Sequence, residues 1–307
     1  MSESQQVDLK EIEAFLKTNF SDSISHIGVI NGGERSKAYV FLSSGIKYIF
    51  RINNHDDGFK KDEYAFEHFS EFVPIPKILK IDSFKDGYYS ISEFCSGSPL
   101  TNDNRELSST LIEDIFTVAD KIHSVPISTK TGYGVADTNG NTNYHSWEEW
   151  ILKANTVVTK DDGSFYSWNE VKKIPFVDEK IIIRLFAQIK DLAQFIPLEK
   201  QLIHCDFGPG NIMVSNNLVT GVIDWNEFGY GDFLFDIAWL DFWIDKTDFK
   251  EAYRAHFQSN NLTIPFYEER MMCHKLFIGL NTLGIYSTIG WEDGYNSTLD
   301  RINKIKF

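Results

Sequence analysis

Three polar residues between apolar runs in residues 202–225 have types and a spacing that suit one kind of chemistry. Asp206 is followed five positions on by Asn211, and Asp224 comes thirteen residues later. When a nucleotide transfers a phosphoryl group, one carboxylate accepts the proton of the attacking hydroxyl. An amide oxygen and a second carboxylate hold the Mg²⁺ ions that bridge the phosphates. The pattern therefore indicates phosphoryl transfer, with Asp206 as general base and Asn211 and Asp224 as metal ligands.

Two short β-strands are expected around these residues, because apolar runs at 212–214 and 219–223 flank a polar turn. Such a hairpin would hold Asp206 and Asn211 in the loop before its first strand and Asp224 at the end of its second. The three side chains would then converge on one point. The alternative is a polar hairpin loop with solvated aspartates, since this spacing alone is only moderately specific.

The same stretch resembles the catalytic motifs of kinases. His204-Cys205-Asp206 with Asn211 matches the catalytic loop H-R-D-x-x-x-x-N, and Ile223-Asp224-Trp225 stands where protein kinases carry D-F-G. A His-x-Asp-x-x-x-x-Asn motif followed by Ile-Asp-Trp resembles the aminoglycoside phosphotransferase family of antibiotic and small-molecule kinases. The resemblance implies a protein-kinase-like fold in which His204 braces the catalytic loop and does not react.

The hydrophobic periodicity predicts a β-rich beginning and a helical remainder. Strands are expected at 26–30, 39–42, 47–53, 78–82 and 88–93, and helices at 8–19 and 60–72. Further helices are expected at 106–123, 147–153, 177–195, 235–244, 249–258, 265–286 and 294–305. The fold class is therefore α+β with two lobes. Residues 1–95 form an antiparallel β-sheet lobe with one main helix that binds nucleotide, and residues 96–307 form a larger α-helical lobe for catalysis and substrate binding.

Nucleotide-binding residues are expected in the first lobe. A Gly-rich turn between the strands at 26–30 and 39–42 can lie over phosphates, and the resemblance assigns Ser36 of this turn a phosphate contact. Kinases carry a Lys on the next strand, where this chain has Arg51, whose guanidinium also grips phosphate. Counting back from the Phe-x-x-x-x-Pro-Ile-Pro ending of the following helix places the partner acid at Asp62, with Glu63 as the alternative.

The segment that links the two lobes follows the strand at 88–93. In kinases the main chain of this short extended segment hydrogen-bonds the adenine edge. By position, the resemblance assigns that contact to the main-chain groups of Ser92 and Phe94. The side chains carry no signal, because residues of any type would serve.

Several longer stretches resemble the hygromycin B phosphotransferases within the family, including the Arg that replaces the usual Lys. These stretches are Gly33–Tyr39, Phe50–Asn53, Asp57–Asp62, His68-Phe69 with Pro74–Pro76, Tyr166–Trp168 and Val222–Trp225. The resemblance implies transfer of the ATP γ-phosphate, with Mg²⁺, to a hydroxyl of an aminocyclitol antibiotic, which confers resistance. A cationic sugar calls for carboxylates and aromatic faces. Candidate substrate contacts are Asn226, Glu227, Asp241, Trp243, Asp245, Asn281 and Tyr286.

Two rival functions stay open. A kinase on the same fold could act on another hydroxylated molecule, such as a macrolide, choline, homoserine or a sugar. A pseudokinase-like module could bind nucleotide without turnover, although such modules usually lack the base or a metal ligand and this chain keeps all three.

Composition limits the partners of the 307-residue chain. The formal net charge of −14 argues against nucleic acid or an anionic membrane and suits a cationic substrate. The three cysteines fit neither a disulfide framework nor a zinc site. Apolar runs fall short of the about 20 residues that a membrane span needs. The expectation is a cytoplasmic monomer.

Overall fold

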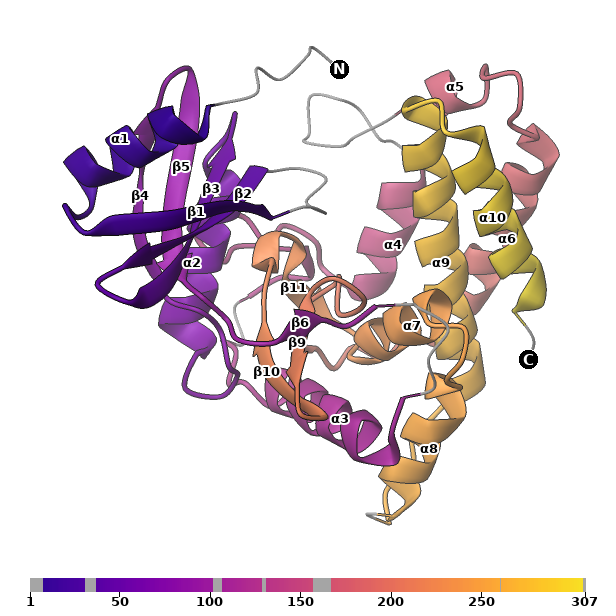
Figure 1. Cartoon of the computed structure of the whole chain (residues 1–307). Helices are drawn as coiled ribbons and strands as arrows, with labels where there is room; N and C mark the ends of the chain where they lie inside the picture. Colours follow the sequence, from indigo (N-terminus) through magenta and orange to yellow (C-terminus); the bar gives the residue numbers. More distant parts are fainter. Residues whose placement is uncertain are drawn as a thin grey trace.

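Two lobes joined by a single crossing of the chain make up the molecule (Figure 1). The structure, a computed structural model, describes residues 8–30, 37–101, 107–128, 131–156, 167–259 and 261–305. The first lobe is a β-sheet with one helix on each face, and the second is mostly helical. The predicted two-lobed α+β fold is confirmed.

The first lobe is built on a five-stranded antiparallel sheet in the order β1-β2-β3-β5-β4. Its strands are β1 (Ile24–Ile30), β2 (Lys37–Ser43), β3 (Ile46–Asn53), β4 (Ile78–Phe84) and β5 (Gly87–Glu93). Helix α1 (Leu9–Asn19) covers one face, where the ring of Phe15 lies 4.7 Å from Phe84 and 5.0 Å from Tyr89 between ring centroids. This aromatic layer is a small core that belongs to the first lobe alone.

Helix α2 (Asp57–Phe69) covers the other face, yet its apolar side belongs to the core of the second lobe. The ring of Phe69 lies 5.8 Å from Trp225 and 5.6 Å from Phe228, and both partners are fully buried. Because side chains of both lobes pack into this cluster, α2 is held against the segment that follows Asp224.

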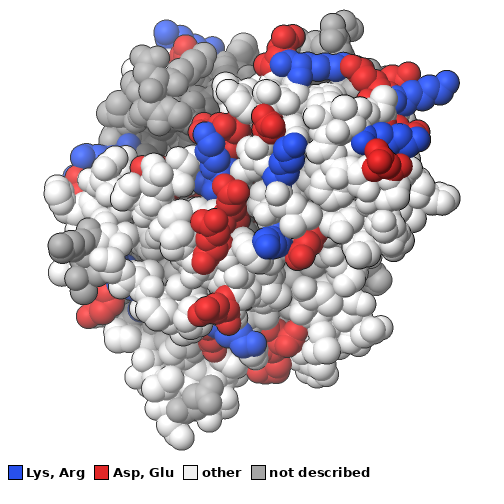
Figure 2. Space-filling model, turned by 90° about the vertical axis from the view of Figure 1, so that its left-hand side faces the viewer, with Lys and Arg blue, Asp and Glu red and all other residues white. Residues whose placement is uncertain are grey.

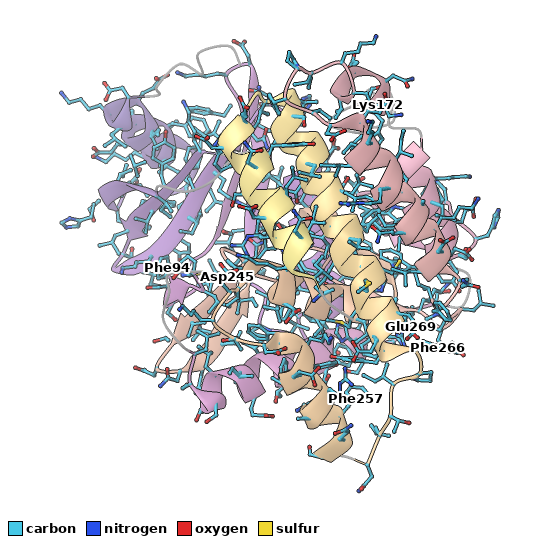
Figure 3. The ribbon with its side chains drawn as sticks, turned by 90° about the vertical axis from the view of Figure 1, so that its right-hand side faces the viewer. Phe94, Lys172, Asp245, Phe257, Phe266 and Glu269 are labelled. Carbon is cyan, nitrogen blue, oxygen red and sulfur yellow. The ribbon has the colours of Figure 1, made fainter. Side chains whose placement is uncertain are left out.

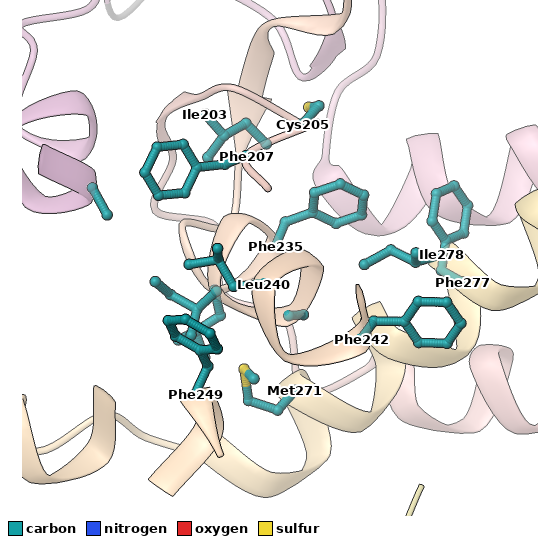
Figure 4. Packing of buried hydrophobic residues seen from close by; sticks show 14 of the residues in the cluster. Ile203, Cys205, Phe207, Phe235, Leu240, Phe242, Phe249, Met271, Phe277 and Ile278 are labelled. Carbon is teal, nitrogen blue, oxygen red and sulfur yellow. The ribbon is translucent and has the colours of Figure 1, made fainter. Parts of the chain in front are cut away.

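The second lobe packs its helices around α9. Its helices are α3 (Ser109–His123), α4 (Trp147–Thr156), α5 (Trp168–Val171), α6 (Glu179–Ala193), α7 (Leu234–Trp243), α8 (Phe249–Ser259), α9 (Tyr267–Thr288) and α10 (Glu292–Lys304). Helix α9 contacts α5, α6, α7 and α10, so it is buried on most sides, and Figure 3 shows α9 and α10 side by side. Apolar residues from the segment around residues 203–207 and from α7 share this core (Figure 4).

Short strands between the lobes carry the catalytic stretch. These are β6 (Ser98–Pro99), β7 (Gly134–Val135), β8 (Gln201–Ile203), β9 (Ile212–Ser215), β10 (Leu218–Val222) and β11 (Gly229–Gly231). The predicted hairpin is confirmed as β9–β10, and both Asn216 and Asn217 in its turn have left-handed backbones, which asparagine tolerates well. The strands β6, β7, β8 and β11 were not predicted from the sequence, since two or three residues carry no periodic signal.

The chain leaves the five-stranded sheet after Glu93 and pairs with β9 of the second lobe at Ser98. The predicted boundary between residues 95 and 96 falls within this crossing. The division into two domains stays a prediction, because α2 shares the core of the second lobe.

The surface and the helices give two further observations. On the face seen in Figure 2, acidic and basic side chains are interspersed over much of the molecule. Within the described ranges, the structure contains no helix that is both long and apolar enough to cross a membrane.

A pH-dependent link joins α3 to α8 through His256. Its ring nitrogens lie 2.9 Å from a carboxylate oxygen of Asp120 and 3.0 Å from one of Glu113. Burial alone would lower the pKa of His256, but the two carboxylates outweigh it and raise the pKa above its usual value. Protonated His256 therefore stabilises the fold below about pH 6.5, the unfolded value, and this contribution is lost as pH rises through the raised folded pKa.

We expect His256→Gln to lower the free energy of unfolding by about 1 kcal/mol at pH 6, the upper range for a partly exposed ion pair. The difference from the unchanged protein should shrink toward pH 9. Urea unfolding at several pH values measures both curves. A difference that does not vary with pH would contradict the ion pair.

Candidate active site

The loop before β9 is held by a buried carboxylate on α7. Asp236 is fully buried, and its two oxygens accept the backbone N–H groups of His204 and Cys205 at 3.0 and 2.9 Å. The ring of His123, at the end of α3, lies 3.1 Å from the same carboxylate. The backbone leading into Asp206 is therefore fixed from two helices.

His204 connects this loop to the strand end before Asp224. Its Nε2 donates to the carbonyl of Ile223 at 3.1 Å, and its Nδ1 accepts the N–H of Asp206 at 3.3 Å. Burial lowers the pKa of His204 and outweighs the nearby carboxylates of Asp236 and Asp224. The imidazole is thus neutral near pH 7, and both of its nitrogens form hydrogen bonds to the backbone. His204 therefore supports the loop structurally, as the sequence predicts.

Asn211 contacts both Asp206 and the residue before Asp224. Its side-chain amide donates to the backbone carbonyl of Asp206 at 2.9 Å, and its backbone carbonyl accepts the N–H of Ile223 at 2.9 Å. The next residue, Asp224, has a left-handed backbone with φ 62° and ψ 66°. Hydrogen bonds therefore link Asp206, Asn211 and the residue before Asp224, and the convergence of the three side chains stays a prediction.

The oxygen donors of Asn211 and Asp224 fit a magnesium ion. The hydrogen bond to Asp206 uses the nitrogen of the Asn211 amide, so its oxygen stays available as a ligand. Mg²⁺ prefers oxygen ligands and is usually held by one or two protein groups together with substrate phosphates. Among the described residues, no group of three or more His, Cys, Asp or Glu side chains could hold a metal ion by itself.

Arg51 on β3 and Asp62 on α2 form an ion pair in the interior of the first lobe, with 2.5 Å between guanidinium and carboxylate. The other oxygen of Asp62 accepts the N–H of Trp225 at 2.8 Å. Burial raises the pKa of Asp62, nearby Asp224 raises it further, and Arg51 opposes both. Of the two acids that the sequence leaves open, Asp62 pairs with Arg51, whereas Glu63 interacts with Lys60 and Glu67.

The remaining nucleotide-binding predictions differ in what the structure says of them. Ser36 lies outside the described residues. Ser92 is inside the sheet with β3 and β4 on its two sides, whereas Phe94 follows the end of β5, where the backbone is no longer in the sheet. Both contacts stay predictions, and Phe94 is the better placed of the two for a main-chain contact with a base.

Two of the predicted substrate carboxylates have partners of their own. Asp241 accepts from Lys275 at 2.7 Å and from the N–H of Lys250 at 2.9 Å. Asp245 makes a bidentate pair with Arg301 at 2.7 and 2.8 Å. These pairs give both acids a structural role in joining α7 to α8, α9 and α10, and their contact with substrate stays a prediction.

The other predicted contacts lie on three segments. Asn226 and Glu227 directly follow the Asp224-Trp225 step, and the amide of Asn226 donates to Glu227 at 3.1 Å. Trp243 ends α7, with the Arg301 guanidinium 5.6 Å from its ring centroid. Asn281 and Tyr286 are half-buried on α9. Glu227 is thus the predicted carboxylate nearest in sequence to the catalytic residues, and its substrate contact is also untested.

Trp239 was missed in the sequence and lies against the catalytic loop. A Cβ added at Gly208 would lie 2.6 Å from its indole Cδ1, so only glycine leaves room for the ring. Its ring centroid is 6.4 Å from that of Trp243, one turn later on the same face of α7. The spacing of four residues between two tryptophans was the available signal.

We expect Asp236→Asn to destabilise the fold by about 1–3 kcal/mol, because its amide nitrogen would face a buried N–H and leave one donor unpaired. Asp245→Asn, at the exposed ion pair beyond the same helix, should cost at most about 1 kcal/mol. Thermal unfolding of the two variants measures the difference. Equal losses would argue against Asp236 as the anchor of the catalytic loop.

Comparison with known proteins identifies relatives of this chain. The chain is 28% identical over 294 residues to hygromycin-B 4-O-kinase from Escherichia coli, covering 92% of this chain and 82% of that enzyme. A thermostable mutant of aminoglycoside phosphotransferase APH(4)-Ia, in ternary complex with AMP-PNP and hygromycin B, superposes with a TM-score of 0.78 at 29% identity and covers 96% of this chain and 97% of that one.

A more distant structure shares the fold alone. Spectinomycin phosphotransferase APH(9)-Ia, solved with ADP and spectinomycin, matches with a TM-score of 0.62 at 14% identity over 98% of this chain and 99% of that one. The model of the phosphotransferase enzyme family (APH) matches residues 26–272, which include the Arg51–Asp62 pair and the whole catalytic stretch. The chain therefore belongs to the phosphotransferase enzyme family.

Proposed function

We propose that this protein transfers the γ-phosphate of ATP to a hydroxyl of an aminoglycoside or aminocyclitol antibiotic of the hygromycin B type, and so confers resistance. The observation that carries the proposal is the likeness, over nearly the whole chain, to structures that hold hygromycin B together with a nucleotide. The arrangement of Asp206, Asn211 and Asp224 supports it independently, because all three groups required for phosphoryl transfer are present.

Asp206 acts as the general base in this proposal. Its carboxylate accepts the proton of the acceptor hydroxyl while the hydroxyl oxygen bonds to the γ-phosphorus and the bond to the β-phosphate oxygen breaks, leaving ADP. The braces from Asp236 and His204 hold its backbone in place before substrate arrives. Asn211 and Asp224 hold Mg²⁺, which offsets the negative charge of the phosphates when bound.

Arg51 serves as the phosphate clamp, with Asp62 orienting its guanidinium from α2. The guanidinium also lies 5.1 Å from the ring centroid of Phe59, one turn before Asp62 on the same helix. An aromatic face and a carboxylate together restrict the guanidinium to one orientation. Ser36 contributes a further phosphate contact, and the main chain of Ser92 and Phe94 binds the adenine edge.

The acceptor is a cation that binds between carboxylates and indole faces. Glu227 and Asn226, directly after the metal-binding step, and Trp243 on α7 are the contacts best supported by position. The net charge of −14 favours a cationic acceptor and disfavours nucleic acid or anionic membrane as partners. We further propose that the enzyme is a monomer and acts in the cytoplasm, where both ATP and the antibiotic are present.

We expect Mg²⁺- and ATP-dependent phosphorylation of hygromycin B in a coupled assay, with kanamycin, gentamicin, erythromycin, choline and homoserine alongside. Asp206→Asn should lower kcat by about 10²–10⁴-fold, the usual contribution of a general base, and leave nucleotide binding in place. Turnover with a different acceptor alone would discard the hygromycin assignment and keep the kinase. Nucleotide binding with no turnover on any acceptor would favour the non-catalytic module.

We expect Arg51→Met to raise the KM for ATP by about tenfold or more, because a charge-assisted contact to phosphate contributes about 1.5–3 kcal/mol. The KM for the acceptor should change little. Arg51→Lys should retain part of the affinity, since an ammonium still contacts phosphate as a point charge. Steady-state kinetics with each substrate varied in turn measures the split, and an equal rise in both KM values would contradict a nucleotide-specific role.

A further inference from the structure

A lysine next to Asp62 makes a contact between the lobes that the proposed reaction does not use. Lys61 is half-buried on α2, and its Nζ donates to the carbonyl of Asn226 at 2.8 Å, across 165 residues of sequence. Its neighbour Lys60 has the same charge but is exposed, and it pairs with Asp56 one turn earlier on the same helix. The two adjacent lysines therefore lie in different environments.

The charge of Lys61 is influenced by acidic groups on three segments. Burial lowers the pKa of Lys61, and the charges of Glu227, Asp57 and Asp137 oppose that shift. A buried ammonium without such neighbours would cost several kcal/mol. The site is therefore built to hold a cation beside the segment that follows Asp224.

The segment around Asp224 needs external support. A left-handed backbone at a residue other than glycine costs of order 1–2 kcal/mol and persists where the surroundings hold it. The N–H of Ile223 donates to Asn211 on one side of Asp224, and the N–H of Trp225 donates to Asp62 on the other. The Lys61 contact to Asn226 is the next support along the chain.

Lys61 and Asp62 thus form a two-residue clamp on two consecutive residues after the metal ligand. Asp62 accepts from the N–H of Trp225, and Lys61 donates to the carbonyl of Asn226. Asp62 pairs with a backbone N–H and Lys61 with a backbone carbonyl. The short helix η2 (Trp225–Glu227) is therefore attached to α2 through two hydrogen bonds.

We propose that Lys61 is a positioning residue that holds Asn226 and Glu227, and through them Asp224, in the conformation that binds the metal–nucleotide complex. The inference rests on the proposed function, because it takes Asp224 as a metal ligand. Lys61 is not among the proposed catalytic, metal-binding, nucleotide-binding or acceptor-binding residues. Lys61 contacts the backbone carbonyl of Asn226 and acts through that segment.

The test compares Lys61→Met with Lys60→Met as a matched control, without any acceptor. Calorimetry of Mg²⁺ binding in the presence of ADP should show an affinity about tenfold or more lower for Lys61→Met, the range for residues that support a metal ligand. Lys60→Met should bind as the unchanged protein does. Lys61→Arg should restore most of the affinity, since a guanidinium also donates to a carbonyl.

A second measurement does not depend on metal or activity. Hydrogen exchange of the amides of residues 222–228 in the free protein should become faster in Lys61→Met and stay unchanged in Lys60→Met. Unaltered exchange and unaltered Mg²⁺ binding in Lys61→Met would overturn the proposal, as would an equal loss in Lys60→Met. If Lys61→Met fails to fold, Lys61→Ala, which lacks a donor, and Lys61→Arg decide, and equal exchange and binding in these two would overturn the proposal.

The two proposals fail in different ways. If the protein without substitutions binds no Mg²⁺ in the presence of ADP, the proposed function is contradicted. Hydrogen exchange of residues 222–228 would still decide whether Lys61 holds this segment.

Discussion

The attachment of α2 to the segment after Asp224 is the contact on which the rest of the site depends. One carboxylate, Asp62, joins the guanidinium of Arg51 to the backbone of Trp225, so the predicted phosphate clamp and the predicted metal ligand are connected through a single side chain. The apolar side of α2 packs on Trp225 and Phe228 and removes water from this junction. In such surroundings an unpaired partner is costly, which favours one arrangement of the lobes.

Two further buried carboxylates organise the second lobe in the same manner. Asp236 fixes the catalytic loop through two backbone N–H groups, and Asp232 is held by Arg270 and His274 from α9. Burial alone would raise the pKa of Asp232, but His274 and Arg270 hold it below its usual value. Asp232 and Asp236 lie four residues apart at the start of α7. This short segment therefore contacts both the loop around His204 and helix α9.

The predicted site residues fall into two groups that differ in how they are held. Hydrogen bonds hold the backbone on either side of the predicted base Asp206 and the predicted metal ligand Asp224, and the predicted phosphate clamp Arg51 pairs with buried Asp62. The predicted acceptor contacts lie in η2, in or just after α7, and on α9, outside these hydrogen bonds.

The sequence alone determined the chemistry of the site and the order of its elements. The predicted hairpin is confirmed, and Asn211 contacts Asp206 and the residue before Asp224, because hairpin geometry is local and short spacings suffice to place these segments. Only the tertiary structure decided that Asp62, and not Glu63, pairs with Arg51. It also showed that Asp241 pairs with Lys275 and Asp245 with Arg301, and that Trp239 packs against Gly208. Each of these contacts joins residues far apart in the chain, and no local pattern of charge or hydrophobicity records which distant side chain a residue meets.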